Sequence, residues 1–347
     1  MSNSLNCKDI EIEVPSNDPF AHDVLNRQRF ADVLDSIIEI YSDTGCVLSL
    51  NGEWGTGKTT FVRMWRQHLT DKGFKTLYFN AWKTDCLDDA LTALLGELKD
   101  VFPNNEHIES VVEKGAKLSL NVVGAIAQGL LRKFTGIEAD ALSATVSSIK
   151  DQFIDSVDSY AKRKADLADF KQSLSELVAS NSNGKPVIFF IDELDRCKPS
   201  YAVQVLERVK HLFEVPNIVF VVAVNEDQLQ YAVQGFYGSS NIDGREYLRR
   251  FFDITLTLPT PDLCEYAKVL YHRHNFDSFF SVPQENYSTN TDQGEYFASF
   301  AGDILAGSNT NLRLANKIFA YTRLVLYGFP NNANICIDTF FCCAILK

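Results

Sequence analysis

Short apolar runs of strand length alternate along the chain with longer segments in which apolar residues recur every three or four positions. The short runs lie at residues 46–50, 74–79, 186–191, 217–224 and 252–258. Parallel strands covered by helices on both faces are apolar along their whole length, so most of these runs favour a parallel sheet. Helical periodicity occupies residues 58–70, 85–101, 151–179 and 200–213, and it prevails after residue 262. The alternation predicts an α/β fold with a doubly wound, mostly parallel sheet.

The loop after the first predicted strand matches the pattern GxxxxGK[ST] at every fixed position. Its residues are Gly52, Glu53, Trp54, Gly55, Thr56, Gly57, Lys58 and Thr59, and Thr60 follows. Glycines let backbone N–H groups point at phosphate oxygens, and the next helix directs its positive dipole end to the same place. Lys58 can reach the β- and γ-phosphates, and the Thr59 hydroxyl can ligate Mg²⁺. Because the loop lies between a predicted strand and a predicted helix, we interpret residues 52–60 as a nucleotide-binding loop.

A second part of the site is predicted where the apolar strand 186–191 ends. Asp192 would lie at the carboxyl edge of the sheet, where it can hold Mg²⁺ through water. Glu193 is placed to polarise an attacking water, as a base rather than as a metal ligand. Together with the phosphate-binding loop, this acid pair predicts binding of ATP or GTP with Mg²⁺, followed by hydrolysis. The sequence contains no NKxD-type guanine motif, which favours ATP.

The wider sequence resembles the KAP family of P-loop NTPases. The resemblance rests on residues 23–27 (DVLNR), 52–55 (GEWG), 79–82 (FNAW), 192–197 (DELDRC) and 247–253 (YLRRFFD), and it extends from about Asp18 to about Lys317. It implies an additional-strand NTPase with strand order 5-1-4-3-2. The strand 217–224 would then lie between the phosphate-loop strand and the Asp192 strand. A long insertion between the two phosphate motifs is also typical of the family.

The resemblance implies roles for two residues near the nucleotide. Asn225 follows the strand 217–224 and would be the polar sensor of the γ-phosphate or of the attacking water. The alternative is an ordinary turn residue. Arg313 matches the arginine on the small helical subdomain of the family that senses nucleotide in cis, and a solvated arginine on a helix face is the alternative.

Two further arginines precede the fifth predicted strand. In related oligomeric ATPases an arginine at this point reaches the nucleotide of the neighbouring subunit, where it supplies positive charge to the transition state. We favour Arg250 for this role over Arg249. Surface ion pairs with Glu246 or Asp243 are the alternative.

The sequence is less informative about the residues that surround these motifs. We expect Tyr78, Phe79 and Trp82, near the end of the second strand, to pack as core rather than to stack on a base. Asp195 and Arg196 could pair with each other, cap the next helix or line an interface, and the sequence does not decide between these.

At 347 residues the chain has room for two domains, or for one large domain with an appendage. We expect a P-loop NTPase core over residues 1–261, with a helical insertion over 103–180. A helical C-terminal subdomain would occupy residues 262–347, and the sequence does not show whether it is complete. Lys and Arg number 33 against 45 Asp and Glu, a net charge of −12. Such a balance disfavours non-specific binding to nucleic acid.

Targeting and metal signals are weak. The eight cysteines are not spaced as CxxC and no paired histidines accompany them, so a zinc site is not expected. The N-terminus lacks a secretory signal, which predicts a cytoplasmic protein. The apolar segment 118–131 would rise about 21 Å as a helix, short of a hydrocarbon core of about 30 Å. We therefore expect a buried or hairpin-forming insertion there and treat membrane contact as the less favoured alternative.

These inferences favour an ATPase switch that couples hydrolysis to a conformational change or to the engagement of a partner protein. We expect a homo-oligomer, and the family resemblance adds bacterial phage defence as a setting. Two rivals are a small-molecule kinase and a scaffold that binds ATP with negligible turnover. The acid pair Asp192–Glu193 favours water over a metabolite hydroxyl as the phosphoryl acceptor.

Overall fold

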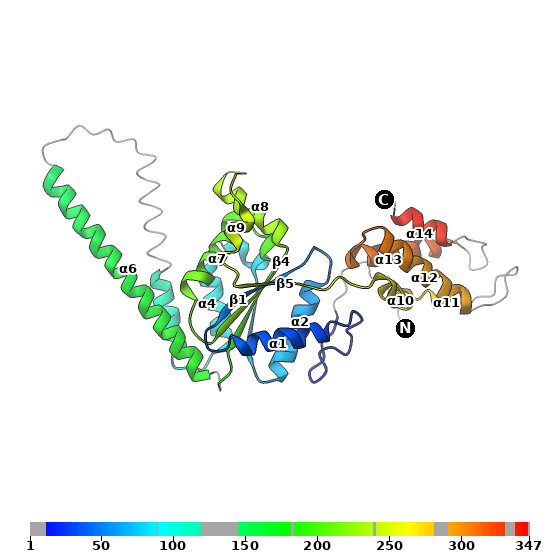
Figure 1. Ribbon diagram of the computed structural model, residues 1–347, viewed down its shortest axis with the longest axis horizontal. Helices are drawn as coiled ribbons and strands as arrows, with labels where there is room; N and C mark the ends of the chain where they lie inside the picture. Colours follow the sequence, from blue (N-terminus) through cyan, green and yellow to red (C-terminus); the bar gives the residue numbers. More distant parts are fainter. Residues whose placement is uncertain are drawn as a thin grey trace. The chain divides into compact units, whose positions relative to one another are not determined.

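The computed structural model describes residues 12–87, 89–118, 145–181, 184–238, 241–280, 291–329 and 337–345 (Figure 1). The chain divides into two compact units, which are described separately. The sheet unit comprises Asp35–Asn51 and Leu69–Leu256. The helical unit comprises Met1–Leu34, Gly52–His68 and Thr257–Lys347. Residues 119–131 of the predicted apolar segment lie outside the described residues. The division into a core over residues 1–261 and a subdomain over 262–347 stays a prediction.

The sheet has the strand order predicted from the family resemblance. Its strands are β1 (Cys46–Asn51), β2 (Lys75–Asn80), β3 (Val187–Asp192), β4 (Ile218–Val224) and β5 (Ile254–Thr257), in the order β2-β3-β4-β1-β5. The pairs β1–β4, β3–β4 and β2–β3 are parallel. Read from the other edge, the order is 5-1-4-3-2, which confirms that β4 lies between β1 and β3. The register sets Asp192 opposite Ala223 and Asn80 opposite Asp192, so polar residues gather at one edge of the sheet.

Complete burial explains the continuous apolar runs. Every residue of β3 and of β4 is buried, whereas the edge strand β5 alternates between half-buried and exposed residues. Two side chains bind β5 to the rest of the sheet. Asp253 accepts a hydrogen bond from the Val47 amide at 2.8 Å, and one Glu226 oxygen accepts from Ser49 at 2.6 Å and from Thr255 at 3.1 Å.

The helices of the sheet unit are α3 (Ala81–Thr84), η1 (Asp85–Leu87), α4 (Ala90–Val101), α6 (Thr145–Asn181), η2 (Leu194–Arg196), α7 (Pro199–Leu212), α8 (Glu226–Tyr237) and α9 (Gly244–Leu248). The helices predicted over residues 151–179 and 200–213 are confirmed as parts of α6 and α7, the one over 85–101 needs a correction, and α3, α8 and α9 were not predicted. The single helix predicted over residues 85–101 is wrong at its start. Asp89 caps α4 by accepting a hydrogen bond from the Leu91 amide at 3.1 Å, so the long helix begins only at Ala90.

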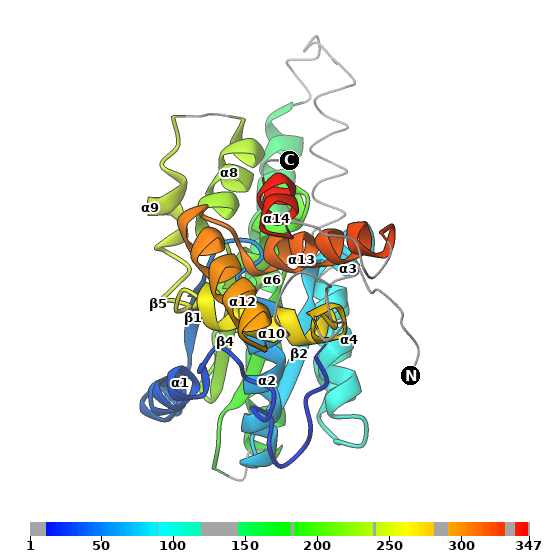
Figure 2. The same ribbon diagram turned by 90° about the vertical axis from the view of Figure 1, so that its right-hand side faces the viewer.

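The helical unit has its own aromatic core. Its helices are the first part of α1 (Gln28–Ile40) and most of α2 (Lys58–Asp71), then α10 (Leu263–Arg273), α11 (Asp277–Phe280), α12 (Thr291–Gly307), α13 (Leu312–Tyr327) and α14 (Ile337–Ile345). Figure 2 shows α10, α12, α13 and α14 gathered together. Phe276, Phe297, Phe319 and Phe341 are fully buried among them. Ring centroids 5.1–6.2 Å apart connect these four phenylalanines into one cluster.

A buried histidine in this core makes a pH dependence testable. His274 contacts the Asn316 amide oxygen at 3.0 Å, and burial lowers the pKa of His274 below its usual 6.5. The folded state therefore favours the neutral ring, and the free energy of unfolding falls as the pH drops below the pKa of the unfolded state, about 6.5. Urea unfolding at pH 7.5 and 5.5 should show a smaller loss in His274→Gln than in the wild type. Equal losses in both proteins would contradict this role of His274.

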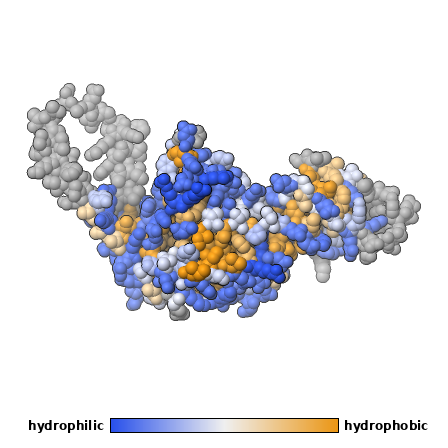
Figure 3. Space-filling model, in the orientation of Figure 1, coloured by the Kyte–Doolittle hydropathy of each residue, from blue (hydrophilic) through white to orange (hydrophobic). Residues whose placement is uncertain are grey.

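The surface seen in Figure 3 is largely hydrophilic, with apolar patches between the hydrophilic regions. Several exposed apolar side chains lie along α13, namely Leu314, Tyr321, Leu324 and Val325. Exposed apolar side chains of this kind are usual on globular proteins. Among the described residues, none of the helices is both long and apolar enough to cross a bilayer.

Candidate nucleotide-binding site

The phosphate-binding loop folds around the ammonium group of Lys58. Lys58 is buried, and its Nζ donates hydrogen bonds to the carbonyl oxygens of Gly52 and, at 3.0 Å, Glu53. Thr56 Oγ1 donates to the same Glu53 oxygen at 2.8 Å. Gly55 and Gly57 have φ values of +80° and +86°, which L side chains rarely adopt. The glycines at these two positions are therefore required by the backbone.

The remaining residues of the predicted loop are accessible or open the following helix. Glu53 and Trp54 are exposed, and Thr59 and Thr60 are half-buried in the first turn of α2. The first backbone N–H groups of a helix have no partners within it and carry its positive dipole end. The loop and the start of α2 thus have the chemistry that binds phosphate.

Arg27 stabilises the loop through hydrogen bonds to its backbone, and the sequence did not predict this role. Its guanidinium donates to the carbonyl oxygens of Thr56 at 2.7 Å, Gly57 at 3.3 Å and Pro259 at 3.3 Å. Burial lowers the pKa of Arg27 to about 10, although the nearby negative charge of Asp23 acts to raise it. The motif DVLNR served only as a mark of resemblance in the sequence. The position of Arg27 in the sequence gave no indication of its distant partners.

A cavity of about 480 Å³ lies beside the loop within the helical unit. Gly55, Gly57 and Thr60 line it from the loop side, and Arg313 lines it from the second position of α13. Its apolar lining consists of Ile12, Ala21, Val24, Leu25, Phe61, Met64, Val269 and Leu312. Ligand cavities of about 300–1,000 Å³ with apolar walls and a few polar groups are typical of small-molecule and cofactor sites. The structure therefore brings Arg313 and the phosphate-binding loop to one cavity.

The predicted acid pair lies at the carboxyl end of β3 in the sheet unit. Asp192 is buried, and its two oxygens accept hydrogen bonds from the Tyr78 hydroxyl and from the Glu193 amide, both at 2.9 Å. One Glu193 oxygen accepts from Asn80 Nδ2 at 2.9 Å, and the other pairs with Arg196 at 3.1 Å. A carboxylate offers about four acceptor sites, so these bonds are compatible with Asp192 holding Mg²⁺ through water.

These contacts correct the interpretation of the neighbouring residues. Phe79 is fully buried, as expected, but Tyr78 is half-buried against Asp192 and Trp82 is 51% exposed. Trp82 is therefore not core. The Asp195 carboxylate accepts a hydrogen bond from the backbone N–H of Asn225 at 3.1 Å, and Arg196 pairs with Glu193.

Asn225 lies directly after β4 and is buried. Its side-chain oxygen caps α8 by accepting a hydrogen bond from the Gln228 amide at 3.2 Å. This cap uses the oxygen and not the Nδ2 amide, so capping does not compete with donation to a phosphate or to a water. The sensor role of Asn225 stays a prediction.

The two candidate finger arginines differ in their contacts. Arg249 pairs with Glu246 at 3.1 Å, and Asp243 caps α9 through the Glu246 amide at 3.0 Å. Arg250 is exposed, and no carboxylate of a described residue lies within 4.0 Å of its guanidinium. The alternative of a surface ion pair thus holds for Arg249, while Arg250 keeps its charge accessible.

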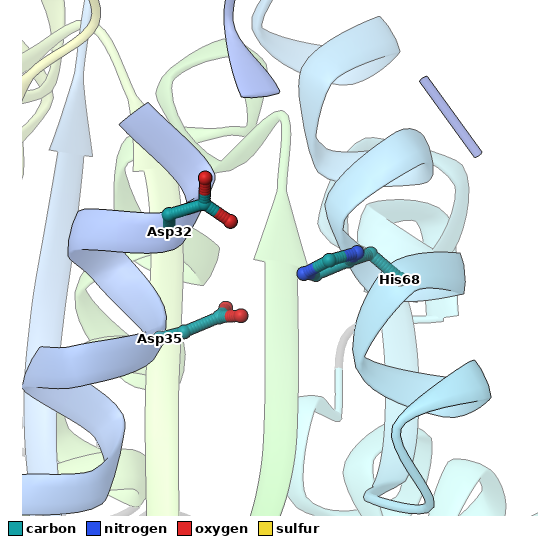
Figure 4. A group of neighbouring side chains, drawn as sticks. All are labelled: Asp32, Asp35 and His68. Carbon is teal, nitrogen blue, oxygen red and sulfur yellow. The ribbon is translucent and has the colours of Figure 1, made fainter. Parts of the chain in front are cut away.

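Figure 4 shows a separate group of polar side chains, with Asp32 and Asp35 on α1 and His68 on α2. The buried Asp35 carboxylate accepts a hydrogen bond from Lys72 at 2.7 Å, so a protein cation already compensates its charge. The His68 ring packs edge-on against Phe20 at 5.6 Å. We assign no metal ion to this group.

Comparisons with known proteins agree with this architecture. No curated protein is significantly similar to the chain. Among solved structures, one of Drosophila ORC bound to DNA has a TM-score of 0.51 and 12% identity over 94% of this chain and 68% of that chain. The Aeropyrum pernix ORC2 protein, in its ADPNP-ADP complexes, has a TM-score of 0.44 and 11% identity over 98% of this chain and 71% of that chain. At 12% identity, the match to Drosophila ORC shows a likeness of fold alone.

The family assignment rests on the sequence as a whole. The model of the KAP family P-loop domain matches residues 27–324, which is most of the chain and includes both phosphate motifs. The strand order and the loop geometry described above are those expected of such a domain. The chain therefore belongs to the KAP family of P-loop NTPases.

Proposed function

We propose that the protein is a Mg²⁺-dependent ATPase switch that couples hydrolysis to a conformational change or to the engagement of a partner. One observation carries the proposal: the phosphate-binding loop and α13 line the same cavity of the helical unit. A nucleotide whose phosphates bind the loop would also contact Arg313. Binding and hydrolysis of the nucleotide would then change the contacts of α13.

The residues divide the chemistry among themselves. Lys58 and the N–H groups of the loop would hold the phosphates and offset their charge. Glu193 would accept the proton of the attacking water. The oxygen of that water would bond to the γ-phosphorus as the bond from the γ-phosphorus to the leaving oxygen of ADP breaks. Asn225 would orient that water or the γ-phosphate. Mg²⁺, held by Thr59 directly and by Asp192 through water, would supply further neutralising charge.

ATP is the nucleotide that we favour. The apolar lining of the cavity suits a base, and Tyr266 and Arg273 are the polar groups there that α10 contributes. Burial raises the pKa of Tyr266 to about 12, so its hydroxyl stays protonated and can donate at neutral pH. Competition of GTP and ATP for the wild-type protein tests the preference, and equal affinities would contradict it.

The exposed Arg250 leads us to propose that the active species is a homo-oligomer. Arg250→Ala should leave ATP affinity unchanged and lower kcat by about 10³-fold, because a finger acts on the transition state of its neighbour. The measurement is kcat together with equilibrium ATP binding. Arg245→Ala, which removes an exposed ion pair with Asp227 at 2.6 Å, is the matched control. Loss of ATP binding in Arg250→Ala would instead indicate a role in cis or in folding.

The scaffold alternative has one observation in its favour. Both oxygens of Glu193 are engaged, by Asn80 and by Arg196, in the state described here. An enzyme whose base is held in this way would hydrolyse ATP slowly until the base is released.

Bacterial phage defence and a cytoplasmic location rest on the sequence alone. A test of the former is whether cells that carry Lys58→Ala lose protection against phage infection.

A further inference from the structure

Glu193 and Arg196 form an ion pair in which other contacts restrain both residues. The two side chains are 17% and 26% exposed, and the Arg196 amide donates to the Glu193 carbonyl oxygen at 3.2 Å within the tight turn η2. Because the pair is partly buried, solvent screens it less than an exposed pair. Asn80 fixes the second Glu193 oxygen from the end of β2. Each Glu193 oxygen therefore already accepts a hydrogen bond from a protein donor.

Arg196 also has a second attractive partner. Its guanidinium carbon lies 5.5 Å from the centroid of the Trp82 ring, within the range of a cation–π contact. Trp82 belongs to α3, which Asn80 caps by accepting a hydrogen bond from the Lys83 amide at 3.0 Å. The ring is 51% exposed, so burial in a core does not account for its presence. The same guanidinium thus contacts the Glu193 carboxylate and the Trp82 face at the same time.

We propose that Arg196 is a positioning residue that restrains Glu193, and that Trp82 holds Arg196 when its pair with Glu193 opens. This inference rests on the proposed ATPase function. A carboxylate oxygen that accepts a charge-assisted hydrogen bond is a poorer proton acceptor. When the pair opens and Arg196 keeps only the Trp82 contact, one Glu193 oxygen loses its charge-assisted hydrogen bond and becomes a better acceptor for the proton of the attacking water. A small movement of the Arg196 side chain suffices, because its contact with Trp82 already exists.

Three variants separate this restraint from a merely structural role. Arg196→Ala should raise kcat by about threefold to tenfold without changing KM for ATP, because the restrained fraction of Glu193 is released. Trp82→Leu should lower kcat, because Arg196 then has only Glu193 as a partner. In the double variant, the loss caused by Trp82→Leu should vanish. Such non-additivity is expected only if Trp82 acts through Arg196.

The matched control is Lys99→Ala, which removes an exposed ion pair with Glu109 at 3.0 Å elsewhere in the sheet unit and should leave kcat unchanged. If the wild type turns over ATP and Arg196→Ala is no faster, or if Trp82→Leu still lowers kcat without Arg196, the restraint is refuted and the ATPase function stands. If the wild type is silent and Arg196→Ala hydrolyses ATP, the restraint is supported. If both bind ATP and neither hydrolyses it, the ATPase function fails and the restraint fails with it.

Discussion

Replacing Lys58 with alanine is expected to abolish nucleotide binding. The Lys58 ammonium lies at the centre of the phosphate-binding loop, where it donates to the Gly52 and Glu53 carbonyl oxygens. Each charge-assisted hydrogen bond lost to a phosphate is worth about 1.5–3 kcal/mol, so two such bonds predict a fall in affinity of about 100-fold or more. Titration of the protein with a fluorescent ATP analogue measures the change.

Two controls make the Lys58 result interpretable. Lys162→Ala removes an exposed lysine of α6 and should bind nucleotide like the wild type. Thermal unfolding without nucleotide shows whether Lys58→Ala still folds, which matters because Lys58 also stabilises the loop. A folded Lys58→Ala protein with normal affinity would mean that the loop does not hold the phosphates.

The second large effect is expected at Glu193. Glu193→Gln should bind ATP with unchanged affinity and lose turnover by about 10²–10⁴-fold, because an amide cannot accept the proton of the attacking water. Single-turnover hydrolysis and equilibrium binding separate the two quantities. Glu176→Gln, which changes an exposed acid on α6 that accepts a hydrogen bond from Gln172, is the matched control. Normal turnover by Glu193→Gln would remove this residue from the mechanism.

The sequence was sufficient for the parts of the site that depend on local order. Lys58 begins α2 because Gly57, with its positive φ, ends the loop immediately before it. Asp192 is the last residue of a strand that is buried throughout, and the change from apolar to acidic residues marks where that strand ends. The strand order required the family resemblance, because apolar runs predict the strands but not which of them are neighbours.

The partners of the site residues could not be predicted. Tyr78 and Asp192 are 114 positions apart in the sequence, and Arg27 and Pro259 are 232 positions apart. Such pairs are determined by the strand order and by the folding of the chain around the loop, not by any local pattern. The strand order 5-1-4-3-2 already implied that the second strand lies beside the Asp192 strand, but that order alone does not give the register of Asn80. Its register partner across that pair is Asp192, next to Glu193.

Trp82 shows why an aromatic residue near a strand end is a weak signal. We expected it to be core because aromatics near strands usually pack. However, the strand ends at Asn80, whose side chain caps α3, and the chain turns into a short helix before Trp82. Helical geometry leaves only Ala81 of α3 buried. The ring is thus left at the surface, within reach of Arg196.

The most direct test of the ATPase account is phosphate release from Mg-ATP as a function of protein concentration, with Glu193→Gln measured beside the wild type. We expect the specific activity of the wild type to rise with concentration, because a neighbouring arginine completes the site, and to vanish in Glu193→Gln. A flat rate near zero in both proteins, with ATP bound, would contradict the account and favour a nucleotide-dependent scaffold.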